Sequence, residues 1–297
     1  MKSNQQAIIA MLLASVLFTA MGMFVKVLTP NLPVIEVAFA RNFFSAIWIL
    51  VALLWIPPKT QVGGKPFVLF FRGFAGGSAM LAYFYNMSVM PLGTAYAFSY
   101  TSPIFLALFT MIFAHERVSA KTWIAILIGF SGILLISNPD TMDLTFLGFL
   151  IGIYSGIGAA LAYLYVAKLA AYYDPRVIIL SLAINGSILP LLTQFVPYDS
   201  YPLALFEPFV MPNFKEWLLL LGLGLVSTYA QVYLTKAYSI GNPPVLGAIS
   251  YITIFLATLA GIILGDQVPH GLVVAGMLLI AFSGILAILH KKQKSPQ

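Results

Sequence analysis

The sequence contains no cysteine, and only 8% of its 297 residues are charged. Without cysteine the chain forms no disulfides, no thiolate zinc sites and no thiol nucleophile. About a quarter of the residues of a soluble globular protein are charged, so 8% is too little to cover a soluble protein of this length. A composition with 61% hydrophobic residues and a mean hydropathy of +0.96 indicates instead a chain embedded in a membrane.

Further absences limit the activities to consider. There is no Walker phosphate-binding loop, so we do not expect ATP to supply the energy. No acidic residue lies deep in an apolar stretch, and only Glu36 is even shallowly embedded. This removes the simplest proton relay and favours exchange, facilitated diffusion or coupling through a site that the sequence does not expose. The three histidines stand singly at the ends of apolar stretches, which argues against an enzyme, a metal site or a cofactor.

Apolar stretches close to the roughly 20 residues that span a bilayer alternate with short breaks rich in proline, glycine and charge. We predict an all-α integral membrane protein with ten transmembrane helices. These helices cover residues 6–28, 33–56, 66–90, 92–114, 122–137, 145–172, 175–196, 214–239, 244–265 and 270–290. Residues 197–212 form the only long connection, which leaves no room for a soluble domain.

The distribution of basic residues orients this bundle, because Lys and Arg gather on the cytoplasmic side. A cytoplasmic N-terminus leaves only three of the fifteen Lys and Arg on the outer side, namely Lys26, Arg41 and Lys215. We therefore predict a multi-pass protein of the cytoplasmic (inner) membrane with both termini in the cytoplasm. The first stretch is followed by nine more spans, and we interpret it as uncleaved.

The second half of the chain repeats the first. Residues 83–116 align with 233–266 at a constant offset, so that Tyr83 matches Tyr233, and the sequence FSGIL occurs at both 130–134 and 282–286. Five helices in each half place the two copies in opposite orientations. The chain is thus predicted to consist of two inverted repeats, residues 1–140 and 141–297, an arrangement typical of secondary transporters.

The region from Arg72 to Ile136 resembles the EamA module of the drug/metabolite transporter superfamily. It has the arginine of RGFAGG opening the third helix, TAYAFSYTSPIF in the fourth, a Glu-Arg turn and a glycine-rich fifth helix. Residues 223–289 are similar to the second EamA copy, although Ile252 stands where the first copy has Ser102-Pro103. The resemblance implies a ten-helix secondary transporter that works by alternating access. It also implies a central cavity lined mainly by helices 1, 3, 4, 6, 8 and 9 of the ten.

Two arginines fall within predicted helices. Arg41 lies eight residues into a helix that begins at Pro33, about 12 Å deep in a hydrocarbon core about 30 Å thick. A charge at that depth is a candidate functional residue, and a guanidinium suits a carboxylate or phosphate of a substrate. The alternative is a structural tie to helix-end carbonyls or to Glu36. Arg72 lies only about 9 Å from the inner surface, and we expect it to extend to the lipid headgroups.

Deep tyrosines and a glutamine complete the predicted substrate site, because a tyrosine offers an apolar ring and a hydroxyl to an amphipathic or ring-bearing solute. With Arg41, the predicted substrate-binding residues are Tyr96, Tyr100, Tyr154, Tyr229, Gln231 and Tyr251. Tyrosine also populates membrane interfaces, which is the role we expect for Tyr83 and Tyr163. The substrate would be amino-acid-like or nucleoside- or flavin-like.

The sequence thus predicts a secondary transporter of a small organic metabolite, with import and export both open. A flippase or scramblase-like protein for a lipid-linked substrate is the alternative on the same fold. An ion channel fits less well, because no carbonyl-lined filter or ring of charges is recognisable. The expected partners are the lipid bilayer and the solute, with a homodimer as an option. Nucleic acid is not expected, since the basic residues are scattered singly.

Overall fold

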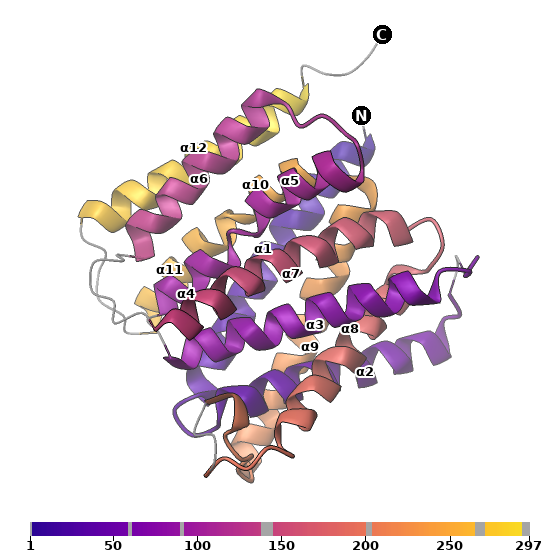
Figure 1. Ribbon diagram of the computed structural model, residues 1–297, viewed down its shortest axis with the longest axis vertical. Helices are drawn as coiled ribbons and strands as arrows, with labels where there is room; N and C mark the ends of the chain where they lie inside the picture. Colours follow the sequence, from indigo (N-terminus) through magenta and orange to yellow (C-terminus); the bar gives the residue numbers. More distant parts are fainter. Residues whose placement is uncertain are drawn as a thin grey trace.

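The computed structural model describes residues 2–58, 61–89, 92–137, 145–199, 204–264 and 271–292. Within these ranges the regular structure is helical, apart from one isolated bridge between Gln61 and Tyr173 (Figure 1). The helices are α1 (Lys2–Leu28), α2 (Val34–Trp55), α3 (Pro66–Val89), α4 (Leu92–Ser99), α5 (Ser102–Phe113), α6 (Ala120–Ser137), α7 (Phe146–Leu169), α8 (Pro175–Thr193), the 3-10 helix η2 (Ala204–Phe206), α9 (Phe214–Ile240), α10 (Pro243–Ser250), α11 (Ile252–Ile263) and α12 (Gly271–Lys292).

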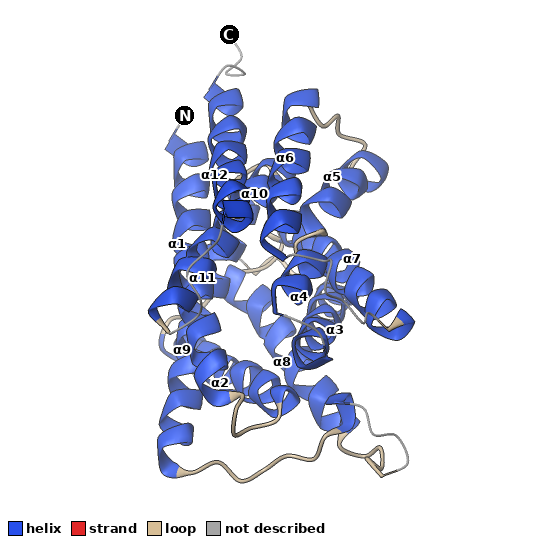
Figure 2. Cartoon of the chain, turned by 90° about the vertical axis from the view of Figure 1, so that its left-hand side faces the viewer, coloured by secondary structure: helices blue, strands red, loops and turns tan. Residues whose placement is uncertain are grey.

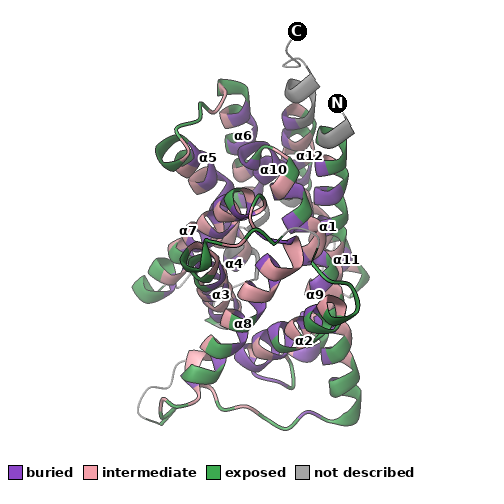
Figure 3. Ribbon diagram, turned by 90° about the vertical axis from the view of Figure 1, so that its right-hand side faces the viewer, coloured by how far each residue is buried: buried purple, intermediate pink, exposed green. Residues whose placement is uncertain are grey.

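Among the described residues, eight helical segments are long and apolar enough to cross a membrane, and α6 and α12 hold shorter apolar stretches, Ala120–Leu135 and Val274–Ala287. Many exposed residues lie on the outer sides of the helices (Figure 3), and large apolar residues are among the exposed ones: Leu54, Trp55 and Phe67 are each at least 80% exposed. Such a surface suits lipid and not water. The predicted helical membrane fold is confirmed, whereas the number of ten spans stays a prediction.

Two helices that the sequence analysis treats as continuous are interrupted. The predicted span 92–114 is divided into α4 and α5 at Tyr100 and Thr101, and the predicted span 244–265 into α10 and α11 at Tyr251. In the first interruption Pro103 has no N–H to donate to the preceding turn, and the backbone N–H of Thr101 instead donates to Phe98 O at 3.1 Å. The second interruption contains no proline, so its sequence does not predict a break in the helix.

The helices pack in matched pairs. α1 packs along α9 in the way that α7 packs along α3, while α5 packs on α7 and α11 packs on α1. α2 contacts α8, and α6 runs beside α12 at the edge of the bundle (Figure 1). Each pairing therefore recurs when the helices from α1 to α6 are exchanged for those from α7 to α12. The start of α1 and the end of α12 lie at the same end of the bundle (Figure 2).

Glycines allow the closest of these contacts. A Cβ on Gly77 would lie 2.9 Å from the backbone N of Gly186 on α8, and one on Gly158 would lie 3.0 Å from the carbonyl of Ala75 on α3. Both distances are shorter than an ordinary van der Waals contact. These positions let α3 approach both α8 and α7, as small residues do between membrane helices.

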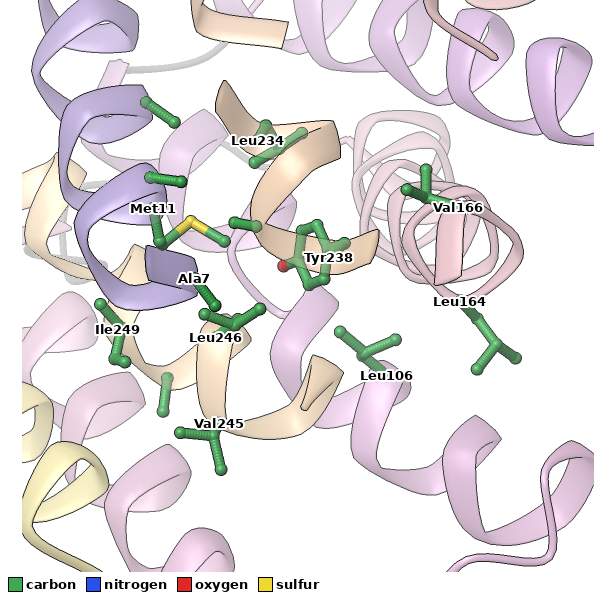
Figure 4. Close-up of a cluster of buried hydrophobic side chains, with 14 of the residues drawn as sticks. Ala7, Met11, Leu106, Leu164, Val166, Leu234, Tyr238, Val245, Leu246 and Ile249 are labelled. Carbon is green, nitrogen blue, oxygen red and sulfur yellow. The ribbon is translucent and has the colours of Figure 1, made fainter. Parts of the chain in front are cut away.

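Two apolar clusters hold the ends of the bundle together. The first joins the early turns of α1 to α5, α9 and α10 through residues such as Met11, Leu106 and Leu246 (Figure 4). The second joins the last turns of α1 to α2, α3 and α9 through residues such as Val25 and Leu223. The middle of α1, which lies between the two clusters, is where the interior opens.

Candidate functional site

A cavity of about 140 Å³ lies within the bundle, alongside the middle of α1. Its walls come from α1, α3, α4, α5, α7, α9, α10 and α11, which correspond to the spans that the family resemblance implies, and in addition from α2 and α8. Every large helix apart from α6 and α12 therefore contributes to it. A cavity of about 150 Å³ can hold a molecule of the size of benzene, so the space admits a small solute.

Arg41 on α2 lies in the wall of this cavity and is only 3% exposed. Its Nε donates to the Met21 sulfur at 3.1 Å, and its Nη1 donates to Asn42 Oδ1 at 3.3 Å and contacts the Met80 sulfur. A thioether is a weak acceptor and an amide oxygen is neutral. The guanidinium is therefore held in position by uncharged groups, which leaves its charge uncompensated within the described chain.

None of the described acidic side chains lines the cavity. Glu36, the alternative partner considered for Arg41, accepts instead a hydrogen bond of 2.8 Å from the backbone N–H of Val210. Glu216 forms a capping box with Asn213 at the start of α9. The proposed tie between Glu36 and Arg41 is thus not made in the structure.

Arg72 on α3 also lies in the cavity wall and is 1% exposed, so the expectation that it reaches the headgroups is wrong. Depth along the helix permitted that extension, but α7 and α8 pack closely against α3 and cover the side chain. Its Nε and Nη1 have no hydrogen-bond partner in the described part of the chain. The Tyr163 side chain lies within electrostatic reach of both Arg72 and Arg41.

Aromatic rings form two further parts of the wall. The rings of Tyr83, Tyr96 and Tyr100 follow one another from α3 along α4, with centroid distances of 5.7 Å and 6.1 Å. Tyr163 on α7 stacks on Tyr238 of α9, with centroids 4.8 Å apart and planes 13° apart. All five rings line the cavity. They offer flat apolar surface beside the two arginines, which suits a solute with both a ring or carbon chain and an anionic group.

Three of the predicted tyrosines do not line the cavity. Tyr251 is fully buried behind Tyr100, with ring centroids 6.3 Å apart, and packs on Gly129 of α6. Tyr154 and Tyr229 are 42% and 53% exposed on the outside of the bundle, and the Tyr154 hydroxyl hydrogen-bonds to that of a serine on α3 at 2.6 Å. Depth along a helix was the criterion that selected them, and depth does not determine which face of the helix points inward.

The structure brings Arg41, Tyr96, Tyr100 and Gln231 together at the cavity. It adds Arg72, Tyr83, Tyr163 and Tyr238, which the sequence analysis did not assign to the site or placed at the interface. A signal for the added residues does exist in the sequence. Lining positions recur every three or four residues, as one face of a helix requires: residues 72, 76, 79, 80 and 83 on α3, 155, 159, 162 and 163 on α7, and 231, 234 and 238 on α9.

Comparison with known proteins places the chain among transporters. The profile of the EamA-like transporter family matches residues 5–138. An uncharacterized transporter of Helicobacter pylori is 33% identical over 283 residues, covering 94% of this chain and 93% of the relative. The pseudopaline exporter of Pseudomonas aeruginosa is 28% identical (97% and 98% covered), and the S-adenosylmethionine uptake transporter of Rickettsia prowazekii is 25% identical (91% and 87%).

The fold agrees with this placement. A solved crystal structure with 20% sequence identity superimposes with a TM-score of 0.81, over 98% of this chain and all of the other. The relatives match the chain over almost its whole length, and the family profile covers its first half. The chain belongs to the EamA-like transporter family of the drug/metabolite transporter superfamily and is a multi-pass membrane transporter.

Proposed function

We propose that the protein is a secondary transporter that moves a small organic metabolite across the cytoplasmic membrane by alternating access. The observation that carries the proposal is the cavity itself, because it holds a buried Arg41 and is lined by helices from both halves of the chain. The apolar clusters at the two ends of α1 are the natural gates, since opening one while the other stays closed exposes the cavity to one side at a time.

Alternating access of this kind needs two halves that can move against each other, and several observations support two inverted repeats of five spans each. The helix pairings recur when the halves are exchanged. The interruptions between α4 and α5 and between α10 and α11 fall at aligned positions, since α5 begins at Ser102 and α11 at Ile252. The family profile ends at residue 138, where the first repeat is expected to end. We infer that α6 and α12 also cross the membrane, which makes ten spans.

Both termini would then lie on the same side of the membrane, in agreement with the common end of the bundle at which α1 begins and α12 ends (Figure 2). The excess of Lys and Arg in the loops on that side assigns it to the cytoplasm. The direction of transport does not follow from the fold: one relative is named as an exporter and another as an uptake transporter. Alternating access operates in both directions, and the solute gradients determine the direction of net transport.

The test of the proposal is transport into vesicles that contain the purified full-length protein. A ligand is first selected by the rise in apparent unfolding temperature that it causes in a panel of amino acids, organic acids, nucleosides and flavins, because binding to the native state stabilises it. Uptake of the selected ligand is then compared between the natural protein, Arg41→Ala and the exposed control Lys215→Ala.

We expect Arg41→Ala to abolish uptake while the protein still elutes as a folded species in size-exclusion chromatography, and Lys215→Ala to transport normally. A hydrogen bond to a charged group contributes about 1.5–3 kcal/mol, so binding should weaken about 10- to 150-fold. Loss of folded protein would assign Arg41 to structure. Movement of a lipid probe between leaflets, without uptake of soluble ligand, would support the flippase alternative.

A further inference from the structure

Two guanidinium groups lie in the wall of the same cavity. Arg41 comes from α2 and Arg72 from α3, they are 3% and 1% exposed, and the side chain of Tyr163 lies near both. Neither is within ion-pair distance of a carboxylate in the part of the chain that the structure describes. Arginine stays protonated in proteins. Among the described residues, the cavity wall thus carries two positive charges and no negative one.

Two buried positive charges destabilise the protein unless anionic groups pair with them. A buried charge without a partner strongly destabilises the state that contains it, and Arg72 leaves Nε and Nη1 without any hydrogen bond. Adjacent N–H groups of a guanidinium match the two oxygens of a carboxylate or phosphate. Each arginine therefore offers a site for one anionic group.

We propose that the transported solute is an organic dianion, a molecule with two carboxylate or phosphate groups, of which Arg41 binds one and Arg72 the other. The inference rests on the proposed transport function and specifies its substrate class. It follows from charge balance at the cavity, since two anionic groups neutralise the two arginine charges that no described side chain compensates. A net cation such as S-adenosylmethionine, with its sulfonium centre, would add a third positive charge and is excluded by the same reasoning.

The remaining lining adds a second requirement. Gln231 Oε1 on α9 and Ser15 Oγ on α1 are buried and have no hydrogen-bond partner within the described chain, and both residues line the cavity. An amide oxygen accepts and does not donate. The dianion should therefore carry a donor, such as an amine or hydroxyl, between or beside its anionic groups, with its carbon skeleton against the stacked Tyr163 and Tyr238 rings.

Matched pairs of small molecules test the proposal on the purified full-length protein. Each pair differs by one anionic group at nearly equal size: glutamate and glutamine, aspartate and asparagine, succinate and succinamate. 3-Phosphoglycerate, which has one carboxylate and one phosphate, represents phosphate, and S-adenosylmethionine represents a cation. The readout is the apparent unfolding temperature as a function of concentration, with sulfate at the same ionic strength as a control for salt.

We expect members with two anionic groups to stabilise the protein at concentrations about 10- to 100-fold lower than their amide counterparts. Arg72→Gln and Arg41→Gln should each remove this discrimination, because one anionic group then has no partner. Arg72→Lys keeps the positive charge but lacks the paired N–H groups of a guanidinium. It should therefore retain part of the discrimination between acids and amides. Lys215→Gln, which removes an exposed charge outside the cavity, should change nothing. Size-exclusion profiles establish that each variant is folded.

The proposal is overturned if amides stabilise as well as their acids, if S-adenosylmethionine stabilises, if no dianion of the panel stabilises, or if folded Arg72→Gln still discriminates. Vesicle uptake separates this inference from the proposed function. Uptake of a neutral or cationic solute would support the transport function and refute the proposed substrate class. Binding of a dianion through both arginines without its uptake would support the binding site and refute the transport function.

Discussion

Gly73 on α3 lies at a close contact between α3 and α8, and replacing it with alanine should destabilise the protein. A Cβ at this position would lie 2.5 Å from the carbonyl oxygen of Ser181 and 2.7 Å from Nδ2 of Asn185, with the Ser181 hydroxyl closer still. Favourable contacts between heavy atoms lie at about 3.5–4.0 Å. The carbonyl belongs to the α8 backbone and cannot rotate away, so the helices must move apart.

The magnitude follows from the size of this overlap. One added methyl group in a packed interior typically costs about 1–3 kcal/mol, which corresponds to an apparent unfolding temperature lower by about 2 °C or more for each kcal/mol. Heating the purified protein and measuring the folded fraction by size-exclusion chromatography gives this temperature. Transport should also fall, because a displaced α3 moves the neighbouring Arg72 in the cavity wall.

Gly284→Ala on α12 is the matched control. A Cβ there meets nothing within 4 Å, so the substitution should be neutral or, through helix propensity, stabilising by up to about 1 kcal/mol. Ser181→Ala in the Gly73→Ala background removes the hydroxyl but not the carbonyl, and we expect it to restore little. An unfolding temperature of Gly73→Ala equal to that of the natural protein would show that α3 and α8 are not packed as described.

Three further outcomes are expected. Arg176→Ala should lower stability by about 1–3 kcal/mol in the same heating assay, because Arg176 pairs with Asp174 at 3.0 Å and donates to three carbonyls at the end of α2. Tyr96→Phe should weaken ligand binding about 2- to 10-fold while Tyr229→Phe leaves it unchanged, since only Tyr96 lines the cavity. Uptake should accelerate when the same solute is present inside the vesicles, and this exchange should survive Glu36→Gln and the removal of a proton gradient. An exchange rate that depends on the proton gradient would contradict this prediction.

Much of the fold followed from the sequence because hydrophobic length is a strong signal. A bilayer requires about 20 apolar residues per helix, and the predicted and observed helix boundaries mostly agree within a few residues, as in α2 and α8. The family resemblance located the cavity among the correct helices. The interruption at Tyr251 was not predictable, because it contains no proline or glycine and depends on how the buried ring packs against Gly129.

The site was predicted only in part, for a geometrical reason. Arg41 could be found because a charge in mid-membrane requires explanation. Arg72 could not be separated from a residue that extends to the headgroups, since the outcome depends on whether neighbouring helices cover it. Tyr154 lies directly before Ser155, which lines the cavity, yet one residue along a helix is a rotation of about 100°. Inward and outward faces become distinguishable only when neighbouring helices are placed.

In the proposed mechanism, the distribution of charge in the cavity would distinguish the parts that move from the parts that select the solute. Both cavity arginines belong to the first half of the chain. Counted from Pro33 and Pro175, Arg41 aligns with Ala183, and at the offset that relates Tyr83 to Tyr233, Arg72 aligns with Gly222. Neither aligned position is charged. The second half contributes neutral groups instead, such as Gln231 and Tyr238. Two halves of like construction can exchange their arrangements at similar energy, which alternating access requires. A solute that is bound electrostatically to one half and by neutral contacts to the other would stay with the first half as the halves move. In the mechanism that we propose, the inverted repeat would account for movement, and the positions where its copies differ would account for selection.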